Sequence, residues 1–391
     1  MPAFFNSSDC ELSIIFQQID REKRMKYLFN LVLRFFATVA MKYYFRQWEI
    51  TGTENIPAKG PVIFAANHQN AFLDAILITC SISRKPWFLA RASVFKSHWA
   101  AKALHFIRMM PIYRIRDGIS GVKRNDEVFE ACMSLLAKNN CMIMFPEGNH
   151  AEEWNLRSLQ RGLPRIALGA ENNNHWQTGL KIIPVGLHYE KPKEFRSRVL
   201  IKFDKPFDVA DYKENYLKDP RKTLDLIKDD LYGKMKKLVF YIPPQNYESL
   251  KQEWLSIRPY RKSIADQLAV DQDIIDSLAA GEKPSQHTSD AKPRHFIHHY
   301  LSAWLIYPFN ILPYKIINWV NNKFVTDHVF TGSIKYAGGL VLVPLFYLTL
   351  SSLVYLFTQN LILFLAFIPA LLILNFLGLD ALKNVVKKSK P

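Results

Sequence analysis

The sequence predicts an α/β domain with a largely parallel sheet flanked by helices, together with an N-terminal interfacial helix and a C-terminal transmembrane hairpin. Three observations predict this architecture. Short apolar runs bounded by turn residues alternate with longer helical stretches through the middle of the chain. An amphipathic stretch precedes them. Two uncharged apolar stretches, each long enough to cross a bilayer, follow them.

The predicted strands are apolar runs that are too short to be core helices. They read VIFAA at 62–66, WFLA at 87–90, PIY at 111–113, CMIMF at 141–145, KIIPVGL at 181–187 and VLIKF at 199–203. Helical stretches lie between them at 74–80, 96–108, 120–138 and 161–171. This alternation favours a parallel sheet with both faces covered, whose functional loops follow the carboxyl ends of the strands.

Residues 25–45 predict a helix with a single polar stripe. The stripe consists of Lys26, Asn30, Arg34, Thr38 and Lys42, at steps of four, and apolar residues fill the rest of the surface. Basic and aromatic residues at the edges favour a helix that lies in the membrane interface. The alternative is an amphipathic helix packed on the soluble domain.

Two uncharged stretches near the C-terminus, Tyr336 to Phe357 and Leu361 to Leu379, predict a transmembrane hairpin. Lysines precede the first stretch and follow the second, so the positive-inside bias places both ends in the cytoplasm. A buried helical pair in a soluble fold is the alternative. Prolines at 308 and 313 interrupt residues 300–320, which therefore predict an interfacial or re-entrant piece.

These patterns divide the chain into four regions. Residues 1–48 hold the amphipathic helix, and residues 49–240 form the expected catalytic domain. Residues 241–294 are charged, with helical stretches at 247–258 and 260–280 and a polar linker after them. Residues 295–391 form the membrane region.

The composition restricts the partners of the protein. A formal charge of +16 indicates an anionic partner, which could be nucleic acid, an anionic lipid surface or a phosphorylated substrate. The apolar C-terminus favours membrane lipids, and nucleic acid is not expected because the basic residues are spread along the chain. The cysteines have neither disulfide nor zinc spacing, so we expect no metal and a reducing cytoplasm around the catalytic part.

The stretch NHQNAFLD at 67–74 follows a predicted strand and contains the first candidate for chemistry. The carboxylate of Asp74 can curl back to a ring nitrogen of His68, fix its tautomer and stabilise the imidazolium that forms on proton uptake. This arrangement makes His68 a candidate general base. In isolation the pair is a weak signal, because a capping Asp beside a loop His would look the same.

A second group of candidates follows the other strands. In FPEGNH at 145–150, a tight turn at Pro146 and Gly148 would present Glu147 and backbone N–H groups at the same sheet edge. Several cations follow strands or begin helices at that edge, and together they predict a phosphate site: Lys96, Arg114, Arg161 and Arg165.

These motifs, in this order, resemble the glycerolipid acyltransferase superfamily, which contains 1-acylglycerol-3-phosphate and glycerol-3-phosphate acyltransferases. The superfamily has an Asn-His and Asp pair, an Arg block, a Phe-Pro-Glu-Gly block and an apolar block with a proline. Here the blocks read NHQNAFLD, MMPIYR from 109, FPEGNH and IIPVGL from 182. The resemblance covers about residues 50–205, and the first and third blocks together are highly specific.

The resemblance implies a role for each block. His68 would be the base and Asp74 its orienting partner. The phosphorylated acceptor would be bound by Asn67, Lys96, Arg114, Glu147, Gly148 and Arg161, and the acyl-donor side would be lined by Ile183, Pro184 and Val185. No metal or cofactor is expected, and acyl-coenzyme A or acyl carrier protein would be the co-substrate.

Two features depart from the usual pattern of the superfamily. Five residues rather than four separate His68 from Asp74, as in a subgroup of glycerol-3-phosphate or dihydroxyacetone-phosphate acyltransferases. The third block continues with Asn149-His150 in place of the Thr-Arg that often follows. Both departures bear on which acceptor is used.

The function predicted from the sequence is O-acyl transfer in phospholipid synthesis, from an acyl thioester to a hydroxyl of 1-acylglycerol 3-phosphate or a similar lyso-phospholipid. Glycerol 3-phosphate or dihydroxyacetone phosphate, acylated at sn-1, is the alternative acceptor. The protein would act on the cytoplasmic side of a membrane, as an integral protein held by the hairpin. A non-enzymatic membrane scaffold is the alternative from another class. A hydrolase with Cys or Ser as nucleophile is disfavoured, since no Gly-x-Ser-x-Gly elbow occurs and the cysteines lie in apolar runs.

Overall fold

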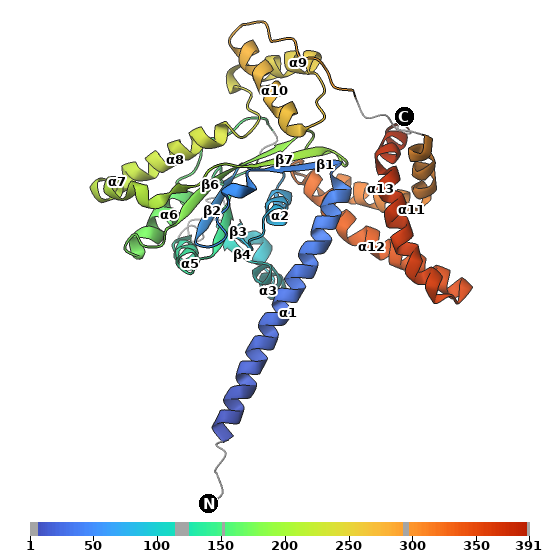
Figure 1. Cartoon of the computed structure of the whole chain (residues 1–391), viewed down its shortest axis with the longest axis horizontal. Coiled ribbons are helices and arrows are strands. Elements are labelled where there is room, and N and C mark those ends of the chain that lie inside the picture. Colours follow the sequence, from blue (N-terminus) through green and yellow to red (C-terminus); the bar gives the residue numbers. More distant parts are fainter. Residues whose placement is uncertain (1–6, 114–124, 151–152, 292–296, 389–391) are drawn as a thin grey trace, which may run out of the picture.

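The computed structural model describes residues 7–113, 125–150, 153–291 and 297–388, and its centre is an eight-stranded sheet (Figure 1). The strands are β1 (Gln47–Thr51), β2 (Val62–Ala66), β3 (Trp87–Arg91), β4 (Met109–Ile112), β5 (Cys141–Met144), β6 (Lys181–Tyr189), β7 (Arg198–Phe203) and β8 (Phe207–Asp208). Their order is β1-β7-β6-β2-β5-β3-β4, and β8 pairs with β6.

Most strands of the sheet are parallel, as the sequence predicts. The central strand β2 is parallel to β5 and β6, and β3 is parallel to β5 and β4. Only at one edge does the direction change, where β7 pairs antiparallel with β6 and β1 pairs parallel with β7. The six predicted strands correspond to β2–β7. Strands β1 and β8 were not predicted, because QWEIT carries too little apolar sequence and β8 has two residues.

Side chains of β2 alternate between two apolar clusters, one on each face of the sheet. Ile63 and Ala65 belong to a cluster with α5 (Asn125–Ala137), α6 (Gly162–Asn173) and α8 (Pro220–Lys236). Val62, Phe64 and Ala66 belong to a cluster with the end of α1 (Ser7–Tyr44), α2 (Phe72–Ser81) and one residue of α12 (Phe330–Thr358). Both faces are therefore covered, which explains the uniformly apolar strands. The sheet domain also contains α3 (His98–Phe106), α7 (Lys213–Lys218) and single-turn helices at Thr53–Asn55, Ala92–Phe95, Val209–Tyr212 and Pro244–Asn246.

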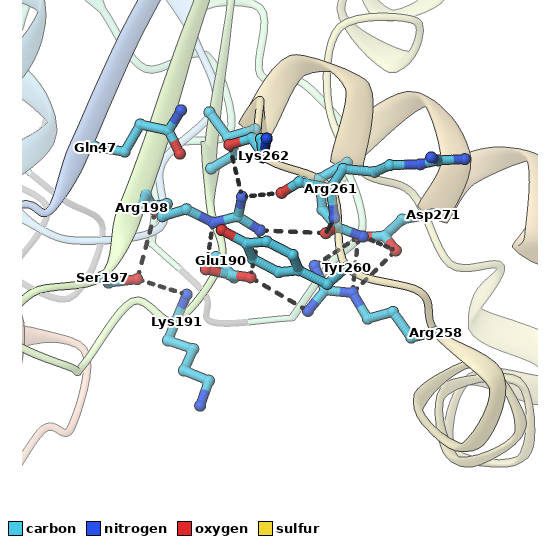
Figure 2. A network of polar contacts seen from close by, with 12 residues as sticks. Gln47, Glu190, Lys191, Ser197, Arg198, Arg258, Tyr260, Arg261, Lys262 and Asp271 are labelled. Atoms are coloured by element: carbon cyan, nitrogen blue, oxygen red, sulfur yellow. Dashed lines mark hydrogen bonds and ion pairs between the residues drawn. The ribbon is translucent and has the colours of Figure 1, made fainter. Parts of the chain in front are cut away.

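The charged region after Phe240 forms a helical pair, α9 (Tyr247–Ile257) and α10 (Ile264–Ala279), which a buried polar network attaches to the β7 edge (Figure 2). The guanidinium of Arg198 on β7 is fully buried and donates to both carboxylate oxygens of Glu190, at 2.7 and 2.8 Å. Arg198 also donates to the carbonyl oxygen of Arg261, just before α10. Arg258 pairs with Asp271 at 2.7 Å. Charge in this region therefore serves to attach the helical pair to the sheet.

Helix α1 is longer than the predicted stretch at 25–45 and projects from the sheet domain (Figure 1). Its last turns pack on the domain through Ala37, Met41 and Tyr44, which are buried. Upstream of these turns, large apolar side chains are exposed at Met25, Tyr27, Leu28, Phe29, Leu31, Val32, Leu33, Phe35 and Phe36. The helix thus has one end packed on protein and an apolar surface along the part that projects.

Residues 300–320 do not break at the two prolines. Helix α11 (Ile297–Phe324) runs through both Pro308 and Pro313, which corrects the expected interruption. A proline inside a helix removes one hydrogen bond, but packing against neighbouring helices can retain the helical path. Here α11 packs against α13 (Leu361–Lys388) through Ala303, Ile306, Leu379 and Leu382.

The predicted hairpin is present as α12 and α13. Both helices are long and apolar enough to cross a membrane. Only 11% of the most apolar 18-residue stretch of α12 is buried within the structure, and 17% of that of α13. Core helices of a soluble fold would be mostly buried, so this exposure disfavours that alternative. Gln359 ends α12 in the left-handed conformation, and the side chain of Asn360 accepts from the N–H groups of Ile362 and Leu363 to begin α13.

One polar cluster joins the three C-terminal helices. Asn310 of α11, Tyr347 of α12 and Asn375 of α13 hydrogen-bond to one another at 2.6 to 2.9 Å. Polar groups in an apolar environment need partners, and each of these side chains finds two of them within the cluster. The cluster therefore specifies how α11 packs against the hairpin.

A buried histidine on β6 predicts a pH dependence of stability. Burial, and to a smaller extent Arg258, lowers the pKa of His188 to about 3, and its Nε2 has no hydrogen-bond partner among the described residues. An unfolded chain takes up this proton near pH 6.5, so the folded state loses roughly 1.4 kcal/mol per pH unit from about 6.5 down to about 3.

When the pH is lowered from about 7.5 to about 5.5, we therefore expect His188→Leu to lose less free energy of unfolding than the wild type. The difference should be about 1.4 kcal/mol in favour of the variant, because one pH unit of this interval lies below about 6.5. Thermal unfolding of purified protein in detergent at both pH values measures it. His98→Leu, at an exposed position, is the control and should follow the wild type. Equal losses in all three proteins would contradict the assignment.

Candidate active site

The candidate site lies where β2, β3 and β5 end at the same edge of the sheet. Asn67 immediately follows β2, and its side-chain amide bonds the backbone of Leu187 on β6 twice. It donates to the carbonyl oxygen at 3.0 Å and accepts from the N–H group at 2.7 Å. Both polar atoms of the Asn67 amide therefore bind β6. These bonds fix the position of the loop at the residue before His68.

His68 and Asp74 meet as the sequence predicts. The Nδ1 atom of His68 lies 2.8 Å from Oδ2 of Asp74, and the carboxylate is fully buried while the imidazole retains 16% exposure. The imidazole stacks on the ring of Phe145 at a centroid distance of 4.0 Å. These contacts fix the ring from one nitrogen and one face, and Nε2 is the nitrogen left to reach a substrate.

Three further donors surround the carboxylate of Asp74. Backbone N–H groups of Gln69 and Asn70 donate to Oδ2 at 2.9 and 2.8 Å, so the loop wraps around the oxygen that His68 uses. The hydroxyl of Tyr189 on β6 donates to Oδ1 at 2.5 Å. Burial, and then the nearby Asp74, raises the pKa of Tyr189, which keeps the phenol protonated as a donor. Both oxygens of the Asp74 carboxylate therefore accept hydrogen bonds from the protein, and these bonds fix the orientation of the carboxylate.

The turn after β5 supports the backbone of His68. Glu147 accepts from the N–H group of His68 at 3.0 Å and from Nε of Arg157 at 3.0 Å. Arg157 also donates to the carbonyl oxygen of Asn149. Burial raises the pKa of Glu147, and Arg157 opposes the shift. Gly148 has φ 68° and closes the turn, with its N–H group donating to the carbonyl oxygen of Phe145.

A second histidine extends the site toward the C-terminal helices. The ring of His150 stands edge-on to that of His68 at 5.5 Å, and its Nε2 lies 3.1 Å from Oδ2 of Asp327, just before α12. Burial lowers the pKa of His150, and the hydrogen bond from His150 lowers that of Asp327. Arg91, the last residue of β3, lies over the ring of Phe330 and interacts electrostatically with His150 and Asp327.

The expected cations differ in where they lie. Arg114 is outside the described residues. Lys96 is exposed after a short helical turn, and Arg161 pairs with Asp225 at 2.6 Å on the surface. Arg165 pairs with Asp126 at 2.9 Å, also on the surface. Arg161 and Arg165 thus pair with surface carboxylates, and neither has a contact with His68 among the described interactions.

The three residues expected on the acyl-donor side lie within β6. Ile183, Pro184 and Val185 are buried, and Ile183 and Val185 belong to the apolar cluster with α2. Pro184 falls between the part of β6 paired with β8 and the part paired with β7. A proline lacks the N–H donor of a sheet ladder, and this interruption of pairing accommodates it.

Several residues of the site gave no separate signal in the sequence. Tyr189, Arg157 and Arg91 reach the site from different strands and loops, and isolated residues of these types are common in any chain. His150 stood within the FPEGNH block, although its aspartate partner lies 177 positions away. No group of three or more potential metal ligands occurs among the residues that the structure describes.

Comparisons with known proteins match the segment that contains this site. Residues 47–188 match the family model described as Acyltransferase. A stretch of 102 residues is 32% identical to glycerol-3-phosphate O-acyltransferase 1 of Saccharomyces cerevisiae, over 26% of this chain and 13% of the relative. A stretch of 161 residues is 26% identical to a chloroplastic 1-acyl-sn-glycerol-3-phosphate acyltransferase of Arabidopsis thaliana, over 40% of each chain.

A solved structure is also similar. The crystal structure of the 1-acyl-sn-glycerophosphate acyltransferase from Thermotoga maritima has a TM-score of 0.38 and 20% identity, over 57% of this chain and 87% of that one. The chain spans less than half the length of the curated relatives named above. The matched segment contains His68, Asp74 and Glu147. The family model and the two curated relatives thus confirm the resemblance to glycerolipid acyltransferases over this segment.

The support of the His68 backbone by Glu147 can be tested through stability. Glu147→Ala leaves a buried N–H group and the guanidinium of Arg157 without their acceptor, which should cost about 1–3 kcal/mol. Glu147→Gln should cost less, because its amide oxygen can still accept from His68. Thermal unfolding measures both. Arg161→Ala is the control, and it should change the midpoint little because its ion pair is exposed. A midpoint for Glu147→Ala equal to that of Arg161→Ala would contradict the support role.

Proposed function

We propose that this protein is a membrane-bound O-acyltransferase that transfers a fatty acyl group from a thioester to a hydroxyl of a phosphorylated glycerol or lyso-phospholipid. The observation that carries the proposal is the oriented pair of His68 and Asp74, within a segment of the acyltransferase family. A base with a fixed tautomer and one free nitrogen is what activation of a hydroxyl requires.

In the proposed reaction, Nε2 of His68 takes the proton of the acceptor hydroxyl as its oxygen attacks the thioester carbonyl. The tetrahedral oxyanion is stabilised by N–H groups or cations at the sheet edge. The oxyanion then collapses, the carbon–sulfur bond breaks, and the thiolate takes the proton from the imidazolium. Asp74 favours the imidazolium throughout, and no acyl-enzyme forms.

Arg91 is the cation that we assign to the phosphate of the acceptor. It ends β3 at the edge of the sheet that carries His68, and it interacts electrostatically with His150, whose ring contacts that of His68. A guanidinium can hold two phosphate oxygens at once. Arg114 and Lys96 remain candidates for the same role from the sequence, whereas Arg161 already has a carboxylate partner.

The membrane attachment has two parts in this proposal. Helices α12 and α13 would cross the bilayer as a hairpin with both ends in the cytoplasm, and the apolar surface of α1 would lie in the interface. Both would hold the site near the place where an apolar acceptor or product partitions. The acyl donor would be acyl-coenzyme A or acyl carrier protein, and 1-acylglycerol 3-phosphate is the preferred acceptor, with glycerol 3-phosphate as the alternative.

A single assay tests the proposal. Purified protein in detergent is supplied with both donors and a panel of acceptors, and release of free thiol is measured. Acyl transfer predicts thiol release that depends on the acceptor. No release with any acceptor would favour the non-enzymatic scaffold, and trapping of a covalent acyl-enzyme would favour a hydrolase.

Substitution of the base tests the mechanism. His68→Ala should lower kcat by about 10²-fold to 10⁴-fold, because general-base catalysis is worth about that much. Asp74→Asn should also lower kcat, since the charge that favours the imidazolium is removed. Rates are measured on folded, purified protein, with thermal unfolding to verify the fold. Wild-type turnover in His68→Ala would contradict the mechanism.

Substitution of the proposed phosphate ligand tests acceptor binding. Arg91→Ala should raise the acceptor KM by about tenfold or more and leave kcat nearly unchanged, because it removes binding shared by ground and transition states. Arg221→Ala, at an exposed position on α8, is the matched control. An acceptor KM that responds equally in both variants would remove Arg91 from the site.

A further inference from the structure

The first turn of α12 contacts the loop that carries His68. The hydroxyl of Ser333 donates to the carbonyl oxygen of Asn70 at 2.6 Å and accepts from the N–H group of Leu73 at 3.1 Å. Ser333 is fully buried, as are Asn70 and Leu73 to within 1%. One side chain of the C-terminal region thereby joins the two sides of the turn between His68 and Asp74.

Gly332 makes this approach possible. A Cβ atom at this position would lie 2.5 Å from Oδ1 of Asn70 and 2.8 Å from the carbonyl oxygen of Pro192, which is too close for any side chain. The Asn70 side chain has little freedom to move away, because its Nδ2 donates to that same carbonyl oxygen at 2.9 Å. The backbone of α12 at Gly332 therefore packs directly against the side chain of Asn70.

The contact occurs where the loop adopts an unfavourable backbone conformation. Ala71 has φ 45° and ψ −131°, which a non-glycine residue rarely adopts and which persists only when its surroundings hold it. Ala71 is one of the five residues between His68 and Asp74, and it lies between the Asn70 carbonyl and the Leu73 N–H group that Ser333 binds. The preceding N–H groups, of Gln69 and Asn70, donate to Asp74.

We propose that Ser333 and Gly332 are positioning residues of the active site, which hold the turn at Asn70 and Ala71 so that Asp74 reaches His68 across five residues. The inference rests on the acyl transfer proposed above. It makes α12 part of the catalytic geometry as well as a membrane segment. Other contacts fix this turn of α12, since Tyr44 donates to the carbonyl oxygen of Gly332 and Lys335 donates to that of Lys193.

Ser333→Ala in the full-length protein tests the proposal. The variant loses both bonds to the turn and should lower kcat by about 10-fold to 100-fold with little change in acceptor KM, since a small displacement of catalytic groups costs this much. Ser351→Ala is the matched control. Ser351 is equally buried in α12 and donates to the carbonyl oxygen of Phe364 at 2.6 Å, but it lies roughly 27 Å farther along the helix.

A glycine pair provides a second comparison on the same helix. Gly332→Ala places a methyl group against Asn70 and should lower kcat, whereas Gly339→Ala meets no atom within 4 Å and should retain it. In a third comparison, Ala71→Gly added to Ser333→Ala should recover part of the lost kcat, because glycine adopts a positive φ without strain. Absence of recovery would contradict the role given to Ala71.

Hydrogen exchange separates this inference from the proposed function. Peptides spanning 67–74 contain the N–H groups of Gln69 and Asn70, whose bonds to Asp74 should open more often without Ser333. We expect faster exchange there in Ser333→Ala and wild-type exchange in Ser351→Ala, whether or not an acceptor has been identified. Wild-type exchange in Ser333→Ala, or equal losses of kcat in the two serine variants, would overturn the proposal. If the wild-type protein shows no acyl transfer but the exchange results are as expected, only the proposed acyl transfer is overturned.

Discussion

The carboxylate of Asp74 is the point on which the organisation of the site depends. It is fully buried, and donors from His68, Gln69, Asn70 and Tyr189 surround it. Removing a carboxylate from water is unfavourable unless hydrogen bonds replace the lost hydration. The requirement for these donors makes the loop curl around the side chain, and this curl directs the imidazole of His68. The geometry of the site is thus a consequence of the hydrogen bonds that one buried acid requires.

The same requirement explains the other buried charges. Glu147 accepts hydrogen bonds from the N–H group of His68 and from Arg157. The bond to His68 keeps the turn after β5 against the turn after β2. Arg198 is satisfied by Glu190 and by backbone carbonyl oxygens, and it attaches the segment before α10 to β7. Glu147 and Arg198 therefore each connect segments that are distant in sequence. The sheet supplies the framework, and the polar contacts determine how loops and added helices sit upon it.

The proposed membrane attachment and the proposed catalysis would be joined in this architecture. Helix α12 begins against the catalytic loop and continues into an apolar segment long enough to span a bilayer. In the acyl transfer that we propose, the acceptor or the product is amphiphilic and partitions into the membrane. A site built on the first turn of a membrane helix would stay at a constant depth relative to such a substrate. A soluble domain tethered by a flexible linker would lack this constraint.

Local sequence was sufficient for much of the protein. The strands β2–β7 and the helical hairpin followed from apolar periodicity, and the meeting of His68 with Asp74 followed from their spacing together with the other motif blocks. Tertiary structure alone decided the rest. The donors to the Asp74 loop include Tyr189, 115 positions away, and Ser333 contacts Leu73 across 260 positions. Helix α11 continues through two prolines because α13 packs against it. Contacts over such separations depend on the folded arrangement of the sheet and helices, and a pattern of neighbouring residues does not encode them.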